Sequence, residues 1–341
     1  PSGIIDASSS HMNELNCIMI EQDSPYDALY LPADTLVDGR IEIRKPGFKV
    51  MGRGMIIGSR WPFAKSHPNW REGYPEWISP DGAIVRPLLA YKRPSGTPED
   101  EGSYFEGVLV AHPYHFCIGY AYLNENLKTF GWRYSSDGIH GKHKRGSFMR
   151  VNDDATYANS GSVEDCVYWG MVNGACFQFG WGLRADNNEH VTIRRIDVLR
   201  GEWDVLPNPG ADGIGIPKNI PEPVDKSKGA NRGVIAGTFR SGRDFTIRNK
   251  HFEDIRVDAQ VNRLFYIGSR TMEVSYEDFT FKDIWFEKEP AYEPDVINVL
   301  SGNRTINNFV FENFRVGDKQ ILGMEDLEPL NQRNIGSITF K

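Results

Sequence analysis

The segments FTIRNKHFEDIRV (residues 245–257) and VSYEDFTFKDIWF (residues 274–286) decide the fold, because they repeat one pattern at a fixed distance. Each reads as a strand of alternating apolar and polar residues, with an Asn or Asp just before a central apolar residue. The central residues of all the copies are Cys166, Ile196, Ile255, Ile284 and Phe314. The steps are 30, 59, 29 and 30 residues, and we interpret the long step as about two turns.

A fixed spacing of this size is typical of stacked repeats. No helical period of useful length competes with the strand pattern. The sequence therefore predicts an all-β fold, a right-handed parallel β-helix with long loop excursions. In such a stack, residues one coil apart in sequence become neighbours at about 4.8 Å.

Three carboxylates, Asp137, Asp153 and Asp154, lie in short polar breaks between apolar runs. Asp137 precedes Asp153 by 16 residues, which we interpret as one shortened coil, so the three side chains are expected to share one face. Like charges in a groove raise one another's pKa, and a protonated acid beside an ionised base is what glycoside hydrolysis needs. The alternative is that Asn-Asp-Asp simply caps a turn.

The surrounding motifs SSDGI, RVNDDA, VYW, VNG and QFGW, in this order, resemble glycoside hydrolase family 49, the dextranase and isopullulanase family, whose catalytic part is a right-handed β-helix. The matching positions are Asp137, Asp153, Asp154, Trp169, Asn173, Gly174 and residues 178–181. The DG and DD pair is similar, more distantly, to the polygalacturonases, whose GHG and RIK motifs are absent at the expected places. Family 49 usually has a lysine shortly after NDD, where this chain has Ala155 and Thr156.

The resemblance implies an inverting glycoside hydrolase that cleaves a polysaccharide, an α-glucan such as dextran or pullulan, without a cofactor or metal. We assign Asp153 as the general acid, and Asp137 with Asp154 as the pair that polarises the attacking water. Neighbouring residues of a strand point to opposite faces, so Asp153 and Asp154 converge only if the NDD segment is a turn or bulge.

Substrate contacts are expected from aromatic rings, amides and cations near the carboxylates. Trp rings pack on sugar C–H faces, and Gln or Asn amides bond sugar hydroxyls. The expected contacts are Gln178, Trp181, Trp132, Asn173, Arg150, Lys144 and Trp61. Arg133 and Arg150 are further expected to hold Asp137 or Asp154 ionised.

Three polar or aromatic segments lie between the apolar runs. Residues 60–105 and 200–235 are rich in Pro and Gly, and we interpret them as long loop excursions from the coils. The first carries Trp61. Residues 142–145 are interpreted as a solvated basic loop, and their position beside the acidic centre supports an alternative substrate, a sulfated or uronic-acid glycan.

Length and composition limit the remaining possibilities. With 341 residues, 40% of them hydrophobic, the chain suffices for one large core, and we expect a single β-helix domain over residues 13–341. Residues 1–12 are small and polar and suggest a tag-derived or disordered segment. The net charge of −7 does not indicate the basic surface that nucleic-acid binding requires. No apolar run approaches the length of a membrane span.

The four cysteines and the histidine pair His112 and His115 are interpreted as structural. Cys17, Cys117, Cys166 and Cys176 lack zinc spacing and are expected to be buried thiols, and no metal site is proposed at His112 and His115.

Two other functions remain open from the sequence. A non-catalytic glycan-binding β-helix would keep Trp and Gln contacts without a paired acid and base, and a polysaccharide lyase shares the fold but uses different chemistry. The hydrolase interpretation places the protein outside the cytoplasm, secreted or periplasmic, with a polysaccharide as its partner and with no nucleic acid or membrane partner.

Overall fold

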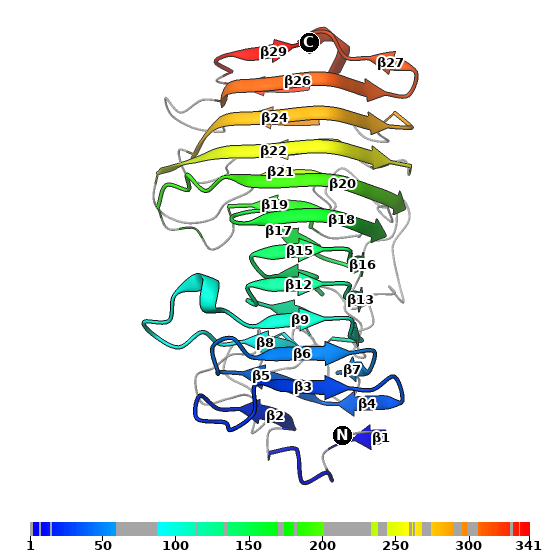
Figure 1. The fold of residues 1–341 in the computed structure, drawn as a ribbon. Coiled ribbons are helices and arrows are strands. Elements are labelled where there is room, and N and C mark those ends of the chain that lie inside the picture. Colours follow the sequence, from blue (N-terminus) through cyan, green and yellow to red (C-terminus); the bar gives the residue numbers. More distant parts are fainter. Residues whose placement is uncertain are drawn as a thin grey trace, which may run out of the picture. The chain divides into compact units, whose positions relative to one another are not determined.

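The structure is a computed structural model, and its strands account for nearly all of its regular structure (Figure 1). It describes residues 3–6, 8–13, 16–58, 87–113, 115–131, 136–169, 174–180, 183, 185–200, 233–237, 244–258, 261, 263–267, 274–289, 295–298, 306–327, 330–333 and 335–341. Two 3-10 helices in these ranges are η2 (Glu99–Glu101) and η4 (Met324–Leu327). Within the same ranges, no helix is long and apolar enough to cross a membrane. The described residues form two compact units, one ending at Asp153 and one beginning at Asp154.

The first unit stacks its strands in three parallel columns. One column contains β3 (Ala28–Leu31), β6 (Lys49–Gly52), β9 (Tyr104–Glu106), β12 (Leu123–Glu125) and β15 (His143–Arg145). The second contains β1 (Gly3–Ile5), β4 (Thr35–Asp38), β7 (Met55–Ile57), β10 (Leu109–Ala111), β13 (Lys128–Phe130) and β16 (Phe148–Arg150). The third contains β2 (Cys17–Ile20), β5 (Arg40–Ile43), β8 (Leu89–Tyr91), β11 (Ile118–Gly119) and β14 (Ile139–His140).

The predicted excursion over residues 60–105 is wrong in its second part. Leu89 and Tyr91 are buried in β8, which pairs with β5 and β11, and β9 continues the first column. The apolar residues around Leu89 form one strand of a coil, and the prolines near them flank this strand instead of marking a loop. Residues 59–86 lie outside the described residues.

The second unit has longer strands. One column contains β18 (Ser162–Trp169), β20 (Val191–Arg200), β22 (Phe245–Val257), β24 (Val274–Phe286), β26 (Ile306–Val316) and β29 (Ile338–Phe340). The other contains β17 (Thr156–Tyr157), β19 (Phe177–Phe179), β21 (Ile235–Gly237), β23 (Phe265–Ile267), β25 (Asp295–Asn298) and β28 (Leu330–Arg333). These pairs are parallel, whereas the short β27 (Lys319–Gln320) runs antiparallel to β26. The predicted fold class, an all-β right-handed parallel β-helix, is confirmed.

The register confirms the repeat read from the sequence. Cys166 pairs with Ile196, Ile255 with Ile284, and Ile284 with Phe314. Ile196 pairs directly with Ile255, so the step of 59 residues is one coil and not two. An insertion between β20 and β22 lengthens that coil.

The Asn or Asp before four of the five central residues has a backbone reason. Asp165, Asp254, Asp283 and Asn313 have φ between 48° and 56°, in the left-handed region that Asn and Asp tolerate better than most residues. Their side chains also bond along the stack, since the Asn313 amide donates to the Asp283 carboxylate at 2.7 Å. The conformation inside the long strands therefore favours Asn or Asp at this position, and β20 alone among these five strands has an arginine there, Arg195 with φ 54°.

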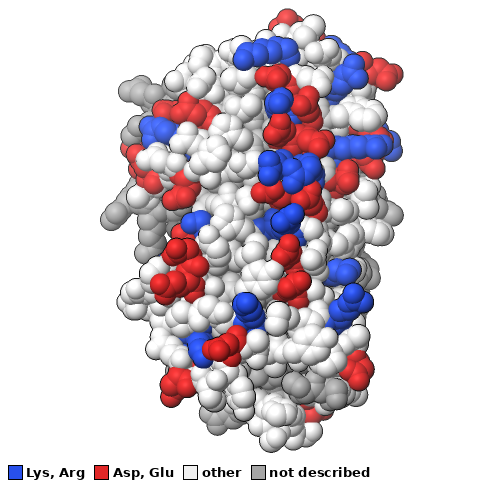
Figure 2. Space-filling view, viewed as in Figure 1, with Lys and Arg blue, Asp and Glu red and all other residues white. Residues whose placement is uncertain are grey.

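Charges alternate in register on the outer face of these strands. Figure 2 shows basic and acidic side chains interspersed over the long strands labelled in Figure 1. One column of paired residues reads Glu164, Arg194, Glu253, Lys282 and Glu312. Arg194 and Glu164 lie 2.8 Å apart, and Lys282 and Glu253 lie 2.9 Å apart. Opposite charges thus face each other across neighbouring strands, which favours this register over a shifted one.

Stacked phenylalanines fill the interior of the second unit. Phe281 lies between Phe252 and Phe311, with ring centroids 5.2 Å and 4.8 Å away and nearly parallel planes. Phe340 continues the stack at 5.1 Å from Phe311. Phe252, Phe281 and Phe311 are fully buried, so each coil depends on the ring of the coil beside it.

The four cysteines are free and buried, as predicted. Burial raises the pKa of Cys17 to about 11 and that of Cys176 to about 12. These thiols remain protonated at neutral pH, and they pack as small apolar side chains.

Candidate active site

Asp153 lies one coil from Asp137 and in register with it. The N–H of Asp153 donates to the carbonyl of Ser136 at 3.2 Å. In the parallel pairs of this stack, a residue donates to the carbonyl of the residue before its partner. Ile118, for example, pairs with Ile139 and donates to the carbonyl of Gly138 at 3.0 Å. By the same pattern, Asp153 is the partner of Asp137. This confirms the shortened coil of 16 residues, and it makes the two carboxylates neighbours along the stack at about 4.8 Å between backbones.

The three carboxylates differ in exposure. Asp137 and Asp154 are both 3% exposed, whereas Asp153 is half-buried. Residues 152–155 lie between β16 and β17 and form bends instead of a strand. Neighbouring side chains alternate strictly only in strands, so this backbone does not force Asp153 and Asp154 to opposite sides. In the second unit, the Asp154 Oδ1 atom accepts the N–H of Ala175 at 2.9 Å.

A buried histidine that sequence reasoning missed contacts Asp137. The Nε2 atom of His140 lies 3.0 Å from the Asp137 Oδ2 atom, and the Phe116 ring lies 4.7 Å from the imidazole. Burial, together with the nearby charges of Lys144 and His115, lowers the pKa of His140 to about 3. Asp137 therefore faces a neutral ring above that pH. The only signal for it in the sequence is its place three residues after Asp137.

Arg150 positions the NDD segment. Its guanidinium donates to the Asn152 Oδ1 atom at 2.7 Å and to the carbonyl of Gly131 at 2.8 Å. The N–H of Asn152 in turn donates to the Ser136 hydroxyl at 3.3 Å. Arg150 is 6% exposed, so these bonds tie the residue before Asp153 to the coil that carries Asp137.

The predicted basic loop over residues 142–145 is wrong. His143–Arg145 form strand β15, and alternation along it turns Lys144 into the interior, where it is 1% exposed. The Lys142 ammonium bonds the Glu99 carboxylate at 2.7 Å. We therefore leave Lys144 out of the substrate contacts proposed below.

The remaining predicted contacts fall into two groups. Gln178 lies in β19 between Phe177 and Phe179, is fully buried, and donates from its amide to the carbonyl of Phe179 at 3.0 Å. Four others lie outside the described residues: Trp61, Trp132, Asn173 and Trp181. Arg133 lies outside them as well.

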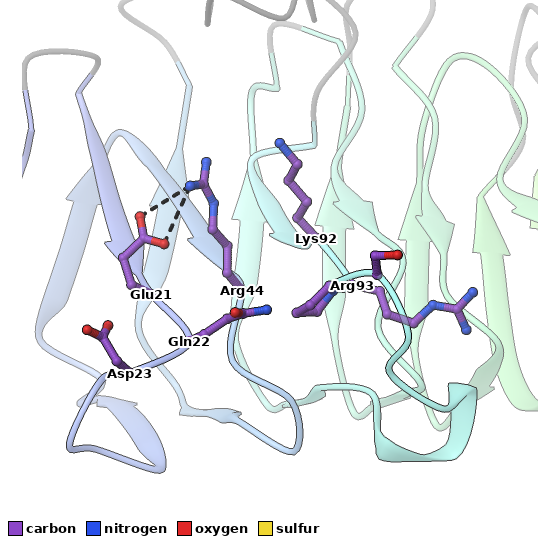
Figure 3. Close-up of a pocket in the computed structure, with 8 residues that line it drawn as sticks. Glu21, Gln22, Asp23, Arg44, Lys92 and Arg93 are labelled. Carbon is purple, nitrogen blue, oxygen red and sulfur yellow. Dashed lines mark hydrogen bonds and ion pairs between the residues drawn. The ribbon is translucent and has the colours of Figure 1, made fainter.

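A charged hollow of about 650 Å³ lies elsewhere in the first unit (Figure 3). Glu21, Asp23, Arg44, Lys92 and Arg93 contribute its charged lining. The Arg44 guanidinium donates to both oxygens of Glu21, at 3.2 Å and 3.4 Å, and it also bonds the buried Glu42. None of the predicted site residues lines it. Acidic groups thus already balance Arg44 in this hollow.

The buried His140 predicts a specific pH dependence of stability. Between its ordinary pKa of 6.5 and about 3, the unfolded chain binds a proton at this residue that the folded protein does not. The free energy of unfolding should therefore fall as the pH falls through this window, by roughly 1.4 kcal/mol per pH unit from this residue. Urea titrations at pH 7 and pH 4.5 should show a smaller loss for His140→Gln than for the wild type. His11→Gln, at an exposed histidine of the same unit, should keep the wild-type loss, and equal losses in all three proteins would contradict the prediction.

Comparisons with known proteins agree on one group of enzymes. No protein-family model matches the chain. A dextranase from Arthrobacter globiformis is 28% identical over 229 residues, which cover 63% of this chain and 33% of the relative. A dextranase from Arthrobacter sp. (strain CB-8) is 26% identical over 300 residues, which cover 80% of this chain and 44% of the relative. The chain thus spans between a third and a half of the length of these relatives.

A solved structure shares the fold. Dex49A from Penicillium minioluteum superimposes with a TM-score of 0.73 and 16% identity, over all of this chain and 59% of that one. At this identity the match supports the fold alone, whereas the relatives from Arthrobacter support the kinship. The chain is a homologue, at modest identity, of the dextranases of glycoside hydrolase family 49.

Proposed function

We propose that the chain is an inverting glycoside hydrolase that cleaves an α-glucan, with dextran as the first candidate. The observation that carries this proposal is the stacking of the half-buried Asp153 on the buried Asp137 in adjacent coils. The half-buried Asp153 is the more accessible of the two to a glycosidic oxygen. Glycoside hydrolysis requires two carboxyl groups in different environments, and these two differ in burial.

In the proposed reaction, Asp153 gives its proton to the leaving glycosidic oxygen as the bond to the anomeric carbon breaks. Water attacks that carbon from the opposite face and passes a proton to the pair formed by Asp137 and Asp154. An inverting site needs about 6.5 to 9.5 Å between acid and base, so that this water fits between them. The mechanism uses only carboxyl groups, and we propose no cofactor.

Dextran is preferred because the relatives in sequence are dextranases. The alternative of an anionic glycan loses the support that the basic run gave it, because Lys144 is interior and Lys142 is paired with Glu99. A non-catalytic glycan-binding module remains the competing function. Action on an external polysaccharide implies that the protein works outside the cytoplasm, secreted or periplasmic.

The release of reducing ends from a panel of dextran, pullulan, polygalacturonate and a sulfated algal glycan tests the proposal. We expect activity on dextran above all. Activity on polygalacturonate or the sulfated glycan alone would replace the proposed substrate class and leave the hydrolase function standing. Binding of dextran in affinity gels without any release would overturn the hydrolase function in favour of the binding module.

A further inference from the structure

Tyr120 combines an exposed ring with an unfavourable backbone conformation. Its φ is 68°, in the left-handed region, and its side chain is 57% exposed. A bulky residue is a true outlier there, and the conformation costs about 1 to 2 kcal/mol relative to an ordinary one. At two other left-handed positions of this unit the chain uses asparagine, Asn16 and Asn126. More than half of the surface of Tyr120 stays exposed, so burial of the rest offsets only part of this cost.

The register places Tyr120 beside the carboxylate site. It follows β11 directly, and its N–H donates to the carbonyl of His140 at 3.2 Å. Its ring lies edge-on to the His140 imidazole, with centroids 6.3 Å apart. Since Gly119 pairs with His140, Tyr120 comes directly after the residue paired with the histidine that contacts Asp137.

The pKa of the Tyr120 hydroxyl lies above its ordinary value. Burial raises the pKa of this phenol, and the negative charge of Asp137 raises it further. The hydroxyl therefore stays protonated at neutral pH and can donate a hydrogen bond. The side chain thus combines an exposed aromatic ring with a hydroxyl that can donate, and its ring contacts the histidine that lies beside Asp137.

We propose that Tyr120 is a substrate-contacting residue, whose ring packs against a glucose unit of the glucan next to the bond that is cleaved. This inference rests on the proposed function, because it names a binding position of the same site. The C–H faces of a pyranose pack on aromatic planes, and the phenol can donate to a sugar hydroxyl. The strained backbone is kept because it directs the ring toward the substrate.

Tyr120→Gly separates the substrate role from a structural one, because glycine adopts the left-handed conformation without strain. We expect this variant to melt at a higher temperature than the wild type and to have a KM for dextran raised about tenfold, with a smaller change in kcat. Tyr120→Phe should keep most of the affinity. Tyr30→Ala, at another exposed tyrosine of the same unit, should leave KM unchanged.

The outcomes distinguish this inference from the proposed function. If the wild type cleaves dextran and Tyr120→Gly retains the wild-type KM, the inference fails and the hydrolase function stands. A lower melting temperature without a change in KM would assign Tyr120 a structural role and would also overturn it. If the wild type cleaves no glycan, dextran affinity gels test the contact by comparing the retardation of the wild type with that of Tyr120→Gly. Weaker retardation of Tyr120→Gly supports the contact between Tyr120 and the glucan, and equal retardation refutes it.

Discussion

Asp153→Asn is expected to lower the turnover of dextran by about 10³-fold, within the range that general acid catalysis contributes. Asparagine keeps the size and shape of the side chain but has no proton to give to the leaving oxygen. Asp153 is half-buried and lies in a bend, so the substitution should leave the free energy of unfolding nearly unchanged. Reducing-end assays and urea titrations on the same preparations measure both quantities. Asp100→Asn, at an exposed carboxylate in η2, is the control that should retain full activity.

An activated substrate tests the role of Asp153 more specifically than the loss of activity does. Fluoride leaves without protonation, so a glycosyl fluoride should restore most of the rate to Asp153→Asn. The same substrate should not restore Asp137→Asn or Asp154→Asn, because the attacking water still lacks its base. Equal defects of Asp153→Asn on dextran and on the fluoride would contradict its assignment as the acid.

Phe281→Ala is expected to cost about 3 to 5 kcal/mol in the free energy of unfolding, the usual range for a buried phenylalanine. Phe281 is fully buried, and its loss removes ring contacts to both neighbouring coils, through Phe252 and Phe311. A stack of coils has no other layer to close over the cavity, because each coil contacts only its neighbours. Guanidinium titrations monitored by circular dichroism measure the effect.

The matched control for this prediction is Leu322→Ala, at a side chain of the same unit that is 64% exposed. It should change the free energy of unfolding by no more than about 0.5 kcal/mol. A cost below about 1 kcal/mol for Phe281→Ala would show that the phenylalanine stack does not hold the coils together.

The strand pairing of the second unit was predictable because the central residue of each repeat shows which residues pair. Every central apolar residue pairs with the next one, and the Asn or Asp before four of the five marks a left-handed backbone position. The distance between Ile196 and Ile255 was misread, since spacing alone does not distinguish two coils from one coil with an insertion. In the first unit the strands have two to four residues, too few for alternation to reveal β8 within a segment rich in proline.

The candidate site was predictable only where it follows the coil spacing. The interval between Asp137 and Asp153 predicted their register. The direction of Lys144 was missed because a three-residue basic strand reads as a loop. His140 and Tyr120 were missed for different reasons: the burial of a histidine depends on the neighbouring coil, and a positive φ at a tyrosine leaves no trace in the sequence.

The anomeric form of the first product tests the central claim most directly. Proton NMR of dextran during the first minutes of hydrolysis, before mutarotation, distinguishes the two anomers of the new reducing end. Because a water held by Asp137 and Asp154 would attack the face opposite to the leaving oxygen, we expect the β-anomer from the α-linked chain. An initial α-anomer would mean a covalent intermediate and a carboxylate nucleophile, and it would contradict the roles assigned to these three residues.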